Sequence, residues 1–266
     1  MIRLFSALLL LPVCFAAAGP MDLGRDEFTV ATYNIFYRNV DLPKLAAVIQ
    51  EAKADLVALQ ETNAESEKFL RRHLGDVYPH MTFREGRRAS DGFGILSKSP
   101  LQNVKFLDPL PGCRGVWLAE VKLGGTAVQI VSVHLATPQT AKLSTIPGAL
   151  RMFQEVEDIH MKEIARLHEA MNRQMPAIVL GDFNSLSMFR APTFLREHGF
   201  TDSLAAVTER PDDHATFQYR AGGNDFPFRL DYIFHNRPMR TRASRVVKSD
   251  ASDHAMVVSR LGWGAP

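Results

Sequence analysis

The chain of 266 residues is 46% hydrophobic and 23% charged, which are ordinary proportions for a globular protein with a full core. Its formal net charge of +2 at pH 7 argues against a protein that coats nucleic acid through bulk positive charge, while leaving a nucleic-acid substrate open. With only two cysteines, Cys14 and Cys113, the chain is not a disulfide-stapled scaffold.

The first 18 residues have the features of a cleaved secretory signal peptide. Arg3 provides a short positive region, an apolar stretch covers 4–15, and small residues end at Ala18, where we expect cleavage. The apolar stretch is too short to span a membrane, and no later run approaches the roughly 18 residues that a span requires. Cleavage removes Cys14, and the residues before it fit poorly with lipidation. The sequence therefore predicts an exported protein, periplasmic or extracellular, without stable membrane insertion.

Residues 19–266 are predicted to form a single domain, because they contain neither repeats nor a Pro- or Ser-rich linker. Seven apolar runs have the length of a strand, and several are rich in Val and Ile: 28–34, 55–61, 115–123, 127–135, 177–182, 230–234 and 255–261. Four other segments have the apolar spacing of a helix: 41–52, 63–74, 152–171 and 191–199. Strands mixed with helices in this way indicate an α/β or α+β sandwich.

Polar side chains stand at the ends of six of these apolar runs. Four runs have a polar residue at or next to their end, and one more polar residue follows the last of these: Asn34, Glu61, His134 and Asp182, then Asn184. Two runs have polar residues next to their start: Asp231, and Asp253 with His254. A single strand ending in Asp indicates a turn, but so many polar ends are hard to ascribe to turns. If the first and last runs have opposite directions, as a mixed sheet allows, these residues meet at one rim.

The residue types at this rim predict hydrolysis of a phosphoester with the help of a metal. Oxygen ligands are available from Asn34, Glu61, Asp231 and Asp253, and no two His residues form an H-x-x-x-H pair. This set favours Mg²⁺ or Mn²⁺ over a structural zinc. His254 can pair with Asp231, which would orient and charge its ring. Neither a G-x-S-x-G elbow nor a P-loop lysine motif is present, so acyl transfer and nucleoside triphosphate hydrolysis lack their usual groups.

Six short motifs contain these residues and follow one another over residues 28–260. They are TYNIF with Asn34, LQE with Glu61, SVHL with His134, GDFNS with Asp182 and Asn184, TF and FRLDYIF with Thr216, Phe217 and Asp231, and SDHAMV with Asp253 and His254. In this order and at these spacings, the chain resembles the endonuclease/exonuclease/phosphatase superfamily. The resemblance implies a four-layered sandwich in which two packed mixed β-sheets are flanked by helices.

The resemblance also implies how the metal and the attacking water are handled. Glu61 is similar to the principal Mg²⁺ ligand of the family, with Asn34 and Asp253 assisting directly or through water. Asp182 resembles the residue that activates the attacking water, although some family schemes make it protonate the leaving oxygen. A general base and a metal carboxylate would therefore face the same phosphate.

Other matched positions are implied to contact the phosphate. Asn184 would hold the scissile phosphate, and His254, oriented by Asp231, would stabilise charge on the phosphoryl oxygens. His134 resembles a second phosphate-contacting imidazole or a general acid, and a histidine satisfied at a strand end is the alternative for it.

Two positions have weaker matches. Arg114 lies in GCRGVW, where many relatives have a phosphate-contacting arginine or tyrosine, and a plain surface arginine is the alternative. Asp91 in SDGFGILS could pair with His134, as an acidic residue does in some nuclease members, or could form an Asp-Gly turn. The polar segment 137–148 is longer than a normal connection and is a candidate substrate loop.

The shared motifs do not choose among DNA, RNA, phospholipids and small phosphate esters. Basic residues cluster at 236–248, which on a loop beside Asp253 could grip a polynucleotide or could form a solvated hairpin. We find no exposed aromatic hairpin of the kind that membrane-acting members insert, since helix packing explains the nearest candidate, 188–195.

These observations predict an exported, Mg²⁺-dependent phosphodiester hydrolase, most nuclease-like and monomeric, whose substrate is a phosphoester such as DNA or RNA. A phospholipase C or sphingomyelinase and a phosphomonoesterase are the enzymatic alternatives. A non-catalytic binding protein on the same fold is disfavoured because Glu61, Asp182 and His254 are all present.

Overall fold

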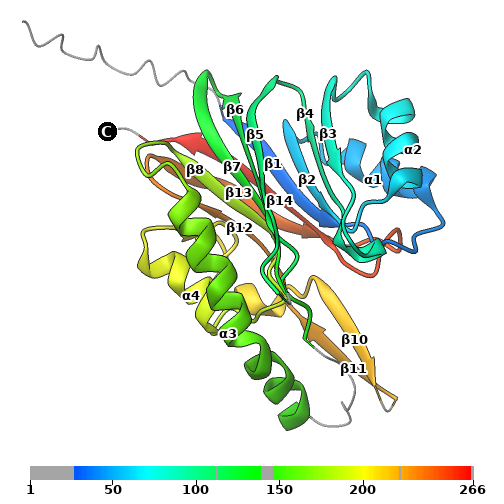
Figure 1. Cartoon of the computed structure of the whole chain (residues 1–266), viewed down its shortest axis with the longest axis vertical. Helices are drawn as coiled ribbons and strands as arrows, with labels where there is room; N and C mark the ends of the chain where they lie inside the picture. Colours follow the sequence, from blue (N-terminus) through cyan, green and yellow to red (C-terminus); the bar gives the residue numbers. More distant parts are fainter. Residues whose placement is uncertain (1–26, 112, 139–145, 222, 265–266) are drawn as a thin grey trace, which may run out of the picture.

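The computed structural model describes residues 27–111, 113–138, 146–221 and 223–264. Two six-stranded mixed β-sheets lie face to face (Figure 1). The first has the order β13-β14-β1-β2-β4-β3, with bounds Met239–Val247, Met256–Trp263, Phe28–Asn34, Leu56–Gln60, Phe93–Ser97 and His80–Arg84. The second has the order β5-β6-β7-β8-β12-β9, with bounds Leu101–Leu107, Val116–Leu123, Thr126–His134, Ala177–Asp182, Asp231–His235 and Thr201–Asp202.

Helices cover the outer face of each sheet, which makes four layers (Figure 1). Helices α1 (Leu42–Glu51) and α2 (Ala64–Leu74) pack on the first sheet, and α3 (Ile146–Ala170) and α4 (Arg190–Glu197) pack on the second. A third apolar cluster, which includes Val30, Trp117 and Leu180, fills the space between the sheets. The predicted four-layered sandwich is therefore confirmed.

Local sequence signals explain where the first two helices begin. Asp41 accepts a hydrogen bond from the backbone N–H of Lys44 at 3.1 Å, and Asn63 and Ser66 form a reciprocal capping box. The other two predicted helices are also found, although α3 begins at Ile146, six residues before the predicted start at 152.

Strand directions bring the polar strand ends to one rim. β1 and β2 are parallel, as are β7 and β8, whereas β14 is antiparallel to β1 and β12 is antiparallel to β8. The register pairs His134 with Asp182, and Asp182 with Asp231. The expected opposite directions of the early and late runs are therefore confirmed, and they create a polar edge across both sheets.

Several strands are not predicted from the sequence: β3, β4, β5, β13, and the two-stranded hairpin of β10 (Phe217–Ala221) and β11 (Asn224–Phe228). One of them corrects the interpretation of the basic segment 236–248. Most of this segment is β13, an edge strand of the first sheet, and not a loop; Lys248, just beyond the strand, does line a pocket together with Asp253. Arg240 is paired with Gly262, at the end of β14 far from Asp253. The charges on this strand protect an exposed edge.

The predicted signal peptide and residues 139–145 of the candidate substrate loop lie outside the described residues. Within the part of the chain that is described, no helix combines the length and the apolar character needed to cross a membrane.

Candidate active site

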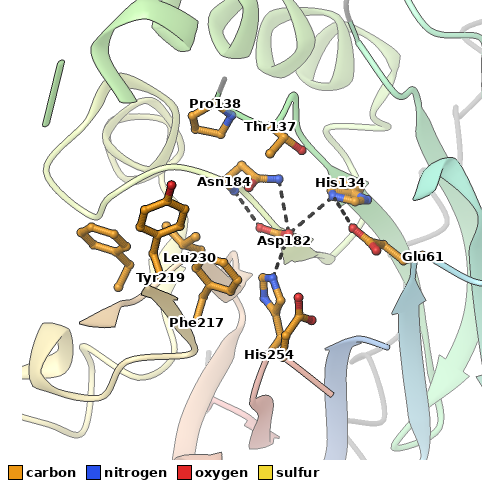
Figure 2. Close-up of a pocket in the computed structure, with 12 residues that line it drawn as sticks. Glu61, His134, Thr137, Pro138, Asp182, Asn184, Phe217, Tyr219, Leu230 and His254 are labelled. Atoms are coloured by element: carbon orange, nitrogen blue, oxygen red, sulfur yellow. Dashed lines mark hydrogen bonds and ion pairs between the residues drawn. The ribbon is translucent and has the colours of Figure 1, made fainter. Parts of the chain in front are cut away.

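The rim where the polar strand ends meet surrounds a pocket of about 150 Å³ (Figure 2). Six predicted site residues line it: Glu61, His134, Asp182, Asn184, Asp253 and His254. The other three, Asn34, Arg114 and Asp231, stand behind this lining and contact it through hydrogen bonds. The structure thus gathers these nine residues at one rim.

The Gly-Asp-Phe-Asn turn at the end of β8 presents Asp182 at the centre of the pocket (Figure 2). Gly181 has a φ of 148°, and a Cβ there would lie 1.9 Å from the backbone oxygen of Val133, so only glycine permits this approach of β8 to β7. Asn184, with a φ of 46°, donates its backbone N–H to Asp182 Oδ1 at 2.8 Å. Its Nδ2 donates to Leu135 O at 3.0 Å and to Asp182 Oδ2 at 3.3 Å. Asn184 here supports Asp182, and its contact with a phosphate stays a prediction.

His254 is held against two carboxylates. Its Nδ1 donates to Asp231 Oδ2 at 2.9 Å, and its Nε2 lies 3.9 Å from Asp182 Oδ2. The ring of Phe217 packs on the imidazole with a centroid distance of 4.7 Å. Burial alone would lower the pKa of His254, but the charges of Asp231 and Asp182 outweigh it and raise the pKa to about 10. The imidazole is therefore a fixed cation at neutral pH.

Asp182 is a carboxyl group whose environment opposes ionisation. Burial, followed by the charge of Asp231, raises the pKa of Asp182 to about 7, against the effects of His254 and of hydrogen bonds from Asn184 and Asn34. Ligand atoms of Asp182, Asp231 and His254 lie within 4.8 Å of one another. Because His254 Nδ1 is already bonded to Asp231, we interpret this cluster as an acid–base group. A carboxyl group with a pKa near neutrality is suited to take a proton from water.

Glu61 lies directly after β2, in a left-handed conformation with a φ of 61°. Its Oε2 accepts the backbone N–H of Tyr37 at 3.1 Å, and its Oε1 faces Asn34 Nδ2 at 3.4 Å. Burial raises the pKa of Glu61, against the hydrogen bond from Tyr37 and the charge of Arg114. Strained backbone of this kind often occurs at functional positions, and a cation bound to Glu61 would offset the cost of burying its charge.

The rim supplies the residue types that a hard divalent cation requires, because Glu61 and Asp253 both line the pocket. The side chain of Asp253 is exposed and available as a second carboxylate. Asn34 donates through Nδ2 to Asp182 at 3.1 Å, while its Oδ1 accepts the N–H of Phe36 at 3.1 Å and keeps one lone pair. Carboxylate and amide oxygens are the ligands that Mg²⁺ prefers. Glu61, Asp253 and Asn34 therefore remain the predicted metal ligands.

Arg114 and His134 form the opposite side of the site. Arg114 Nη1 lies 2.7 Å from His134 Nε2 and 3.8 Å from Glu61 Oε1, and it donates to Ser90 O at 2.9 Å. Burial, followed by the charge of Arg114, lowers the pKa of His134 well below its usual value. The neutral ring therefore accepts a hydrogen bond from the guanidinium, which disfavours the general-acid role for His134. Arg114, with 13% of its side chain exposed, is a component of the site and not a plain surface arginine.

Asp91 has the role of a turn residue in the structure. Its Oδ2 accepts the backbone N–H of Arg88 at 3.1 Å, and its Oδ1 lies 3.9 Å from Arg114 Nε. The described polar contacts of the His134 ring are to Arg114, Glu61 and Asp182, so the alternative pairing of Asp91 with His134 is not found. Asp91 instead acts on the site through Arg114.

One wall of the pocket is aromatic, and the sequence analysis misses it. In the β10–β11 hairpin, Phe217 pairs with Phe228 and Tyr219 pairs with Phe226, so the four rings share one face. Three of them line the pocket: Phe217, Tyr219 and Phe228. The sequence analysis expects no exposed aromatic hairpin of the membrane-inserting kind, and the rings of this unpredicted hairpin are half-buried. The alternation of aromatic and polar residues was the available signal, but the strands are short and have Gln, Arg, Asp and Pro on the other face.

The fold and the buried acid–base group together define a phosphoesterase-type α/β sandwich. A model of the endonuclease/exonuclease/phosphatase family matches residues 31–254. The chain therefore belongs to this family, whose members typically use a divalent metal. No curated protein sequence matches the chain with significance.

Solved structures of low sequence identity share the fold. An endonuclease/exonuclease/phosphatase from Beutenbergia cavernae DSM 12333 has a TM-score of 0.68 at 20% identity, covering 91% of this chain and 72% of that one. D. rerio TDP2 complexed with single strand DNA product has a TM-score of 0.68 at 16% identity, covering 89% and 99%. Beta toxin 275-280 from Staphylococcus aureus has a TM-score of 0.65 at 18% identity, covering 87% and 99%. These likenesses establish the architecture and leave the substrate open.

Proposed function

We propose that this protein is an exported, Mg²⁺-dependent phosphodiester hydrolase of the nuclease-like kind. The main support is the buried pairing of Asp182, whose pKa is raised to about 7, with His254, whose pKa is raised to about 10, at one pocket. A base that is partly ionised near neutral pH and a fixed imidazolium are the groups that attack of water on phosphorus requires.

In the proposed reaction, the phosphorus of the substrate lies between Asp182 and His254. The carboxylate of Asp182 takes a proton from water while the water oxygen bonds to phosphorus and the bond to the leaving oxygen breaks. The imidazolium of His254, fixed by Asp231, donates a hydrogen bond to a phosphoryl oxygen as negative charge develops there. The leaving oxygen takes up a proton from the surrounding water.

Glu61 and Asp253 would hold the divalent cation, with Asn34 assisting. When bound, Mg²⁺ or Mn²⁺ supplies Lewis-acid stabilisation of the phosphoryl charge. The protein prepares for this by burying Glu61 against Tyr37 N–H and Asn34 Nδ2, which limits the orientations of the carboxylate.

The aromatic wall supports a polynucleotide substrate. Phe217 and Tyr219 line the pocket beside His254, where a base next to the scissile phosphate could stack on a ring. The likeness to D. rerio TDP2, whose structure contains a single strand DNA product, agrees with this choice. The same hairpin favours a second candidate, a phospholipid head group, because four rings on one face also suit an apolar surface.

Cleavage of supercoiled plasmid by the purified protein in Mg²⁺ tests the proposal, with Glu61→Ala prepared identically as the control for contaminating nuclease. We expect wild-type protein to nick the plasmid and the variant to leave it intact. If neither cleaves, the nuclease assignment fails, and turnover of sphingomyelin vesicles, a phosphate diester and a monoester with the same leaving group then decides among the alternatives.

We propose export on the basis of the first 18 residues, whose positive, apolar and small-residue regions follow the order of a signal peptide. Cell fractionation of the full-length chain would test this: we expect a shortened form outside the cytoplasm. A full-length form retained in the cytoplasm would contradict it. We also propose that the mature protein acts as a monomer, which its elution volume in gel filtration would test.

A further inference from the structure

One turn of α3 places two buried polar side chains on the backbone N–H and C=O of a single residue, Ala136. His160 Nε2 donates to the backbone oxygen of Ala136 at 2.7 Å, and Glu163 Oε2 accepts the backbone N–H of Ala136 at 3.0 Å. His160 and Glu163 are three residues apart, so they lie on the same face of the helix. Ala136 follows β7 and is two residues beyond His134. The helix therefore fixes both polar groups of the segment that leaves the active site.

The same carboxylate also holds the neighbouring loop. Glu163 Oε1 accepts the backbone N–H of Arg114 at 3.2 Å, and Glu163 is 3% exposed. The two loops meet again at their side chains, since Arg114 Nη1 lies 2.7 Å from His134 Nε2 and Arg114 Nη2 donates to Thr137 Oγ1. Glu163 therefore holds both of the backbone segments whose side chains form the Arg114–His134 contact.

We propose that Glu163 is a positioning residue of the active site, which holds Arg114 and the segment after His134 in their working arrangement. This inference rests on the proposed phosphodiesterase function. It assigns Glu163 no contact with substrate or metal, because its two oxygens face backbone N–H groups of Arg114 and Ala136.

The geometry makes this role depend on the charge of Glu163. A carboxylate accepts strongly from both N–H groups, whereas protonation turns one oxygen into a hydroxyl, which is a weaker acceptor, and so weakens one of the two bonds. Burial raises the pKa of Glu163 to about 7, against the N–H groups of Ala136 and Arg114, the Cys113 thiol and the Arg114 charge. His160 is neutral in this range, because burial lowers its pKa to about 4. The positioning contact should therefore strengthen as pH rises through about 7.

Glu163→Gln keeps the shape of the side chain and imitates the protonated state. Glu157→Gln is a matched control, because Glu157 lies on the same helix, is buried, and accepts a backbone N–H from Arg190 at the start of α4, away from Arg114. Amide hydrogen exchange measured by NMR at pH 8 should accelerate at least about fivefold at Arg114 or Ala136 in Glu163→Gln, and at Arg190 only in the control. Unchanged exchange at both Arg114 and Ala136 would overturn the proposal whatever the enzyme does.

The second readout is kcat/KM for bis(4-nitrophenyl) phosphate in Mg²⁺ between pH 5.5 and 9, expressed as the ratio of variant to wild type. The ratio cancels the titration of groups that both proteins share, including Asp182. We expect it to be near one below pH 6 and to fall to about one tenth above pH 8, with the Glu157→Gln ratio flat. A ratio for Glu163→Gln that does not change with pH would assign Glu163 a structural role only. If wild type shows no turnover, the proposed function fails, and the exchange measurement still decides whether Glu163 holds the two loops.

Discussion

Strand β12 has a buried ionisable residue at each end, and the two ends differ in chemistry. At one end, Asp231 accepts a hydrogen bond from His254, whose pKa is raised to about 10. At the other end, His235 contacts Thr241 Oγ1 at 2.8 Å, and burial lowers its pKa. Both histidines are buried. At His235 burial outweighs the charge of Asp202 and lowers the pKa, whereas at His254 the hydrogen-bonded Asp231 and the neighbouring Asp182 outweigh burial and make the imidazole a fixed cation.

The cavities at the two ends of β12 also differ in volume. The cavity lined by His235, Arg237 and Arg240 has a volume of about 540 Å³, compared with about 150 Å³ for the pocket at the catalytic rim. Arg237 and Arg240 are exposed, and no carboxylate is among the described residues that line this larger cavity. Convergence of buried opposite charges, and not volume or positive charge, therefore distinguishes the candidate active site.

The largest expected effect is that of Glu61→Ala. Because a metal site supplies several kcal/mol of transition-state stabilisation, Mg²⁺-dependent diester turnover should fall by more than about a thousandfold. The measurement is kcat/KM over a Mg²⁺ titration, with Glu67→Ala, which removes a half-buried carboxylate of α2 away from the pocket, as control. If Glu61→Ala hydrolysed the diester at the wild-type rate at limiting Mg²⁺, the metal would have to lie elsewhere.

His254→Ala should lower kcat by about 10²–10³, the typical cost of one preorganised donor. His235→Ala removes an equally buried imidazole from the other end of β12 and should change kcat by less than about threefold, although it lowers Tm. Steady-state kinetics and thermal melts of both variants sharpen the comparison. A near-wild-type rate for His254→Ala would assign the imidazole function to His134.

The stability of the protein should reflect the raised pKa of His254. A histidine that binds its proton more tightly in the folded state stabilises the fold fully below its unfolded pKa of about 6.5, and this contribution is lost as pH rises to about 10. The difference in Tm between wild type and His254→Ala should therefore shrink by several degrees between pH 7 and pH 10. A difference that stays constant would mean that the imidazole is not charged in the folded protein.

The smallest expected effect concerns the basic residues at the far end of the sandwich. The double variant Arg237→Ala, Arg240→Ala should change diester turnover and plasmid cleavage by less than about twofold, because Arg240 pairs with Gly262 far from Asp253. Side-by-side rates at the same ionic strength test this. A loss of plasmid cleavage alone would show that a long polynucleotide extends along β13 to this end.

The position of the candidate active site could be predicted from the sequence, because the residues that end each strand are marked by the local pattern of apolar and polar residues. An apolar run fixes a strand, and the residue that ends the run must lie at a sheet edge, as Glu61 and Asp182 do. Opposite strand directions then place Asp231 and His254 at the same edge.

Two features that the sequence does not predict, strand β13 and the role of Glu163, depend on partners that are distant in the chain. The segment containing Arg240 and Arg245 is too polar and exposed to resemble a strand, and it becomes one by pairing with β14 at the edge of a sheet. Glu163 is one polar residue of an amphipathic helix, and its role depends on backbone groups 27 and 49 residues earlier. Such tertiary hydrogen bonds leave no periodic signal in the sequence.

The most direct test of the account compares wild type with Asp182→Asn in the hydrolysis of bis(4-nitrophenyl) phosphate, with and without Mg²⁺. The substitution preserves the shape of the side chain and removes the base. We predict turnover by wild type only with the metal, and a loss of about 10²–10⁴ in Asp182→Asn under conditions in which both proteins are folded. Equal rates for the two proteins, or turnover by wild type that is independent of Mg²⁺, would contradict the claim that this buried acid–base group is a metal-dependent phosphodiesterase site.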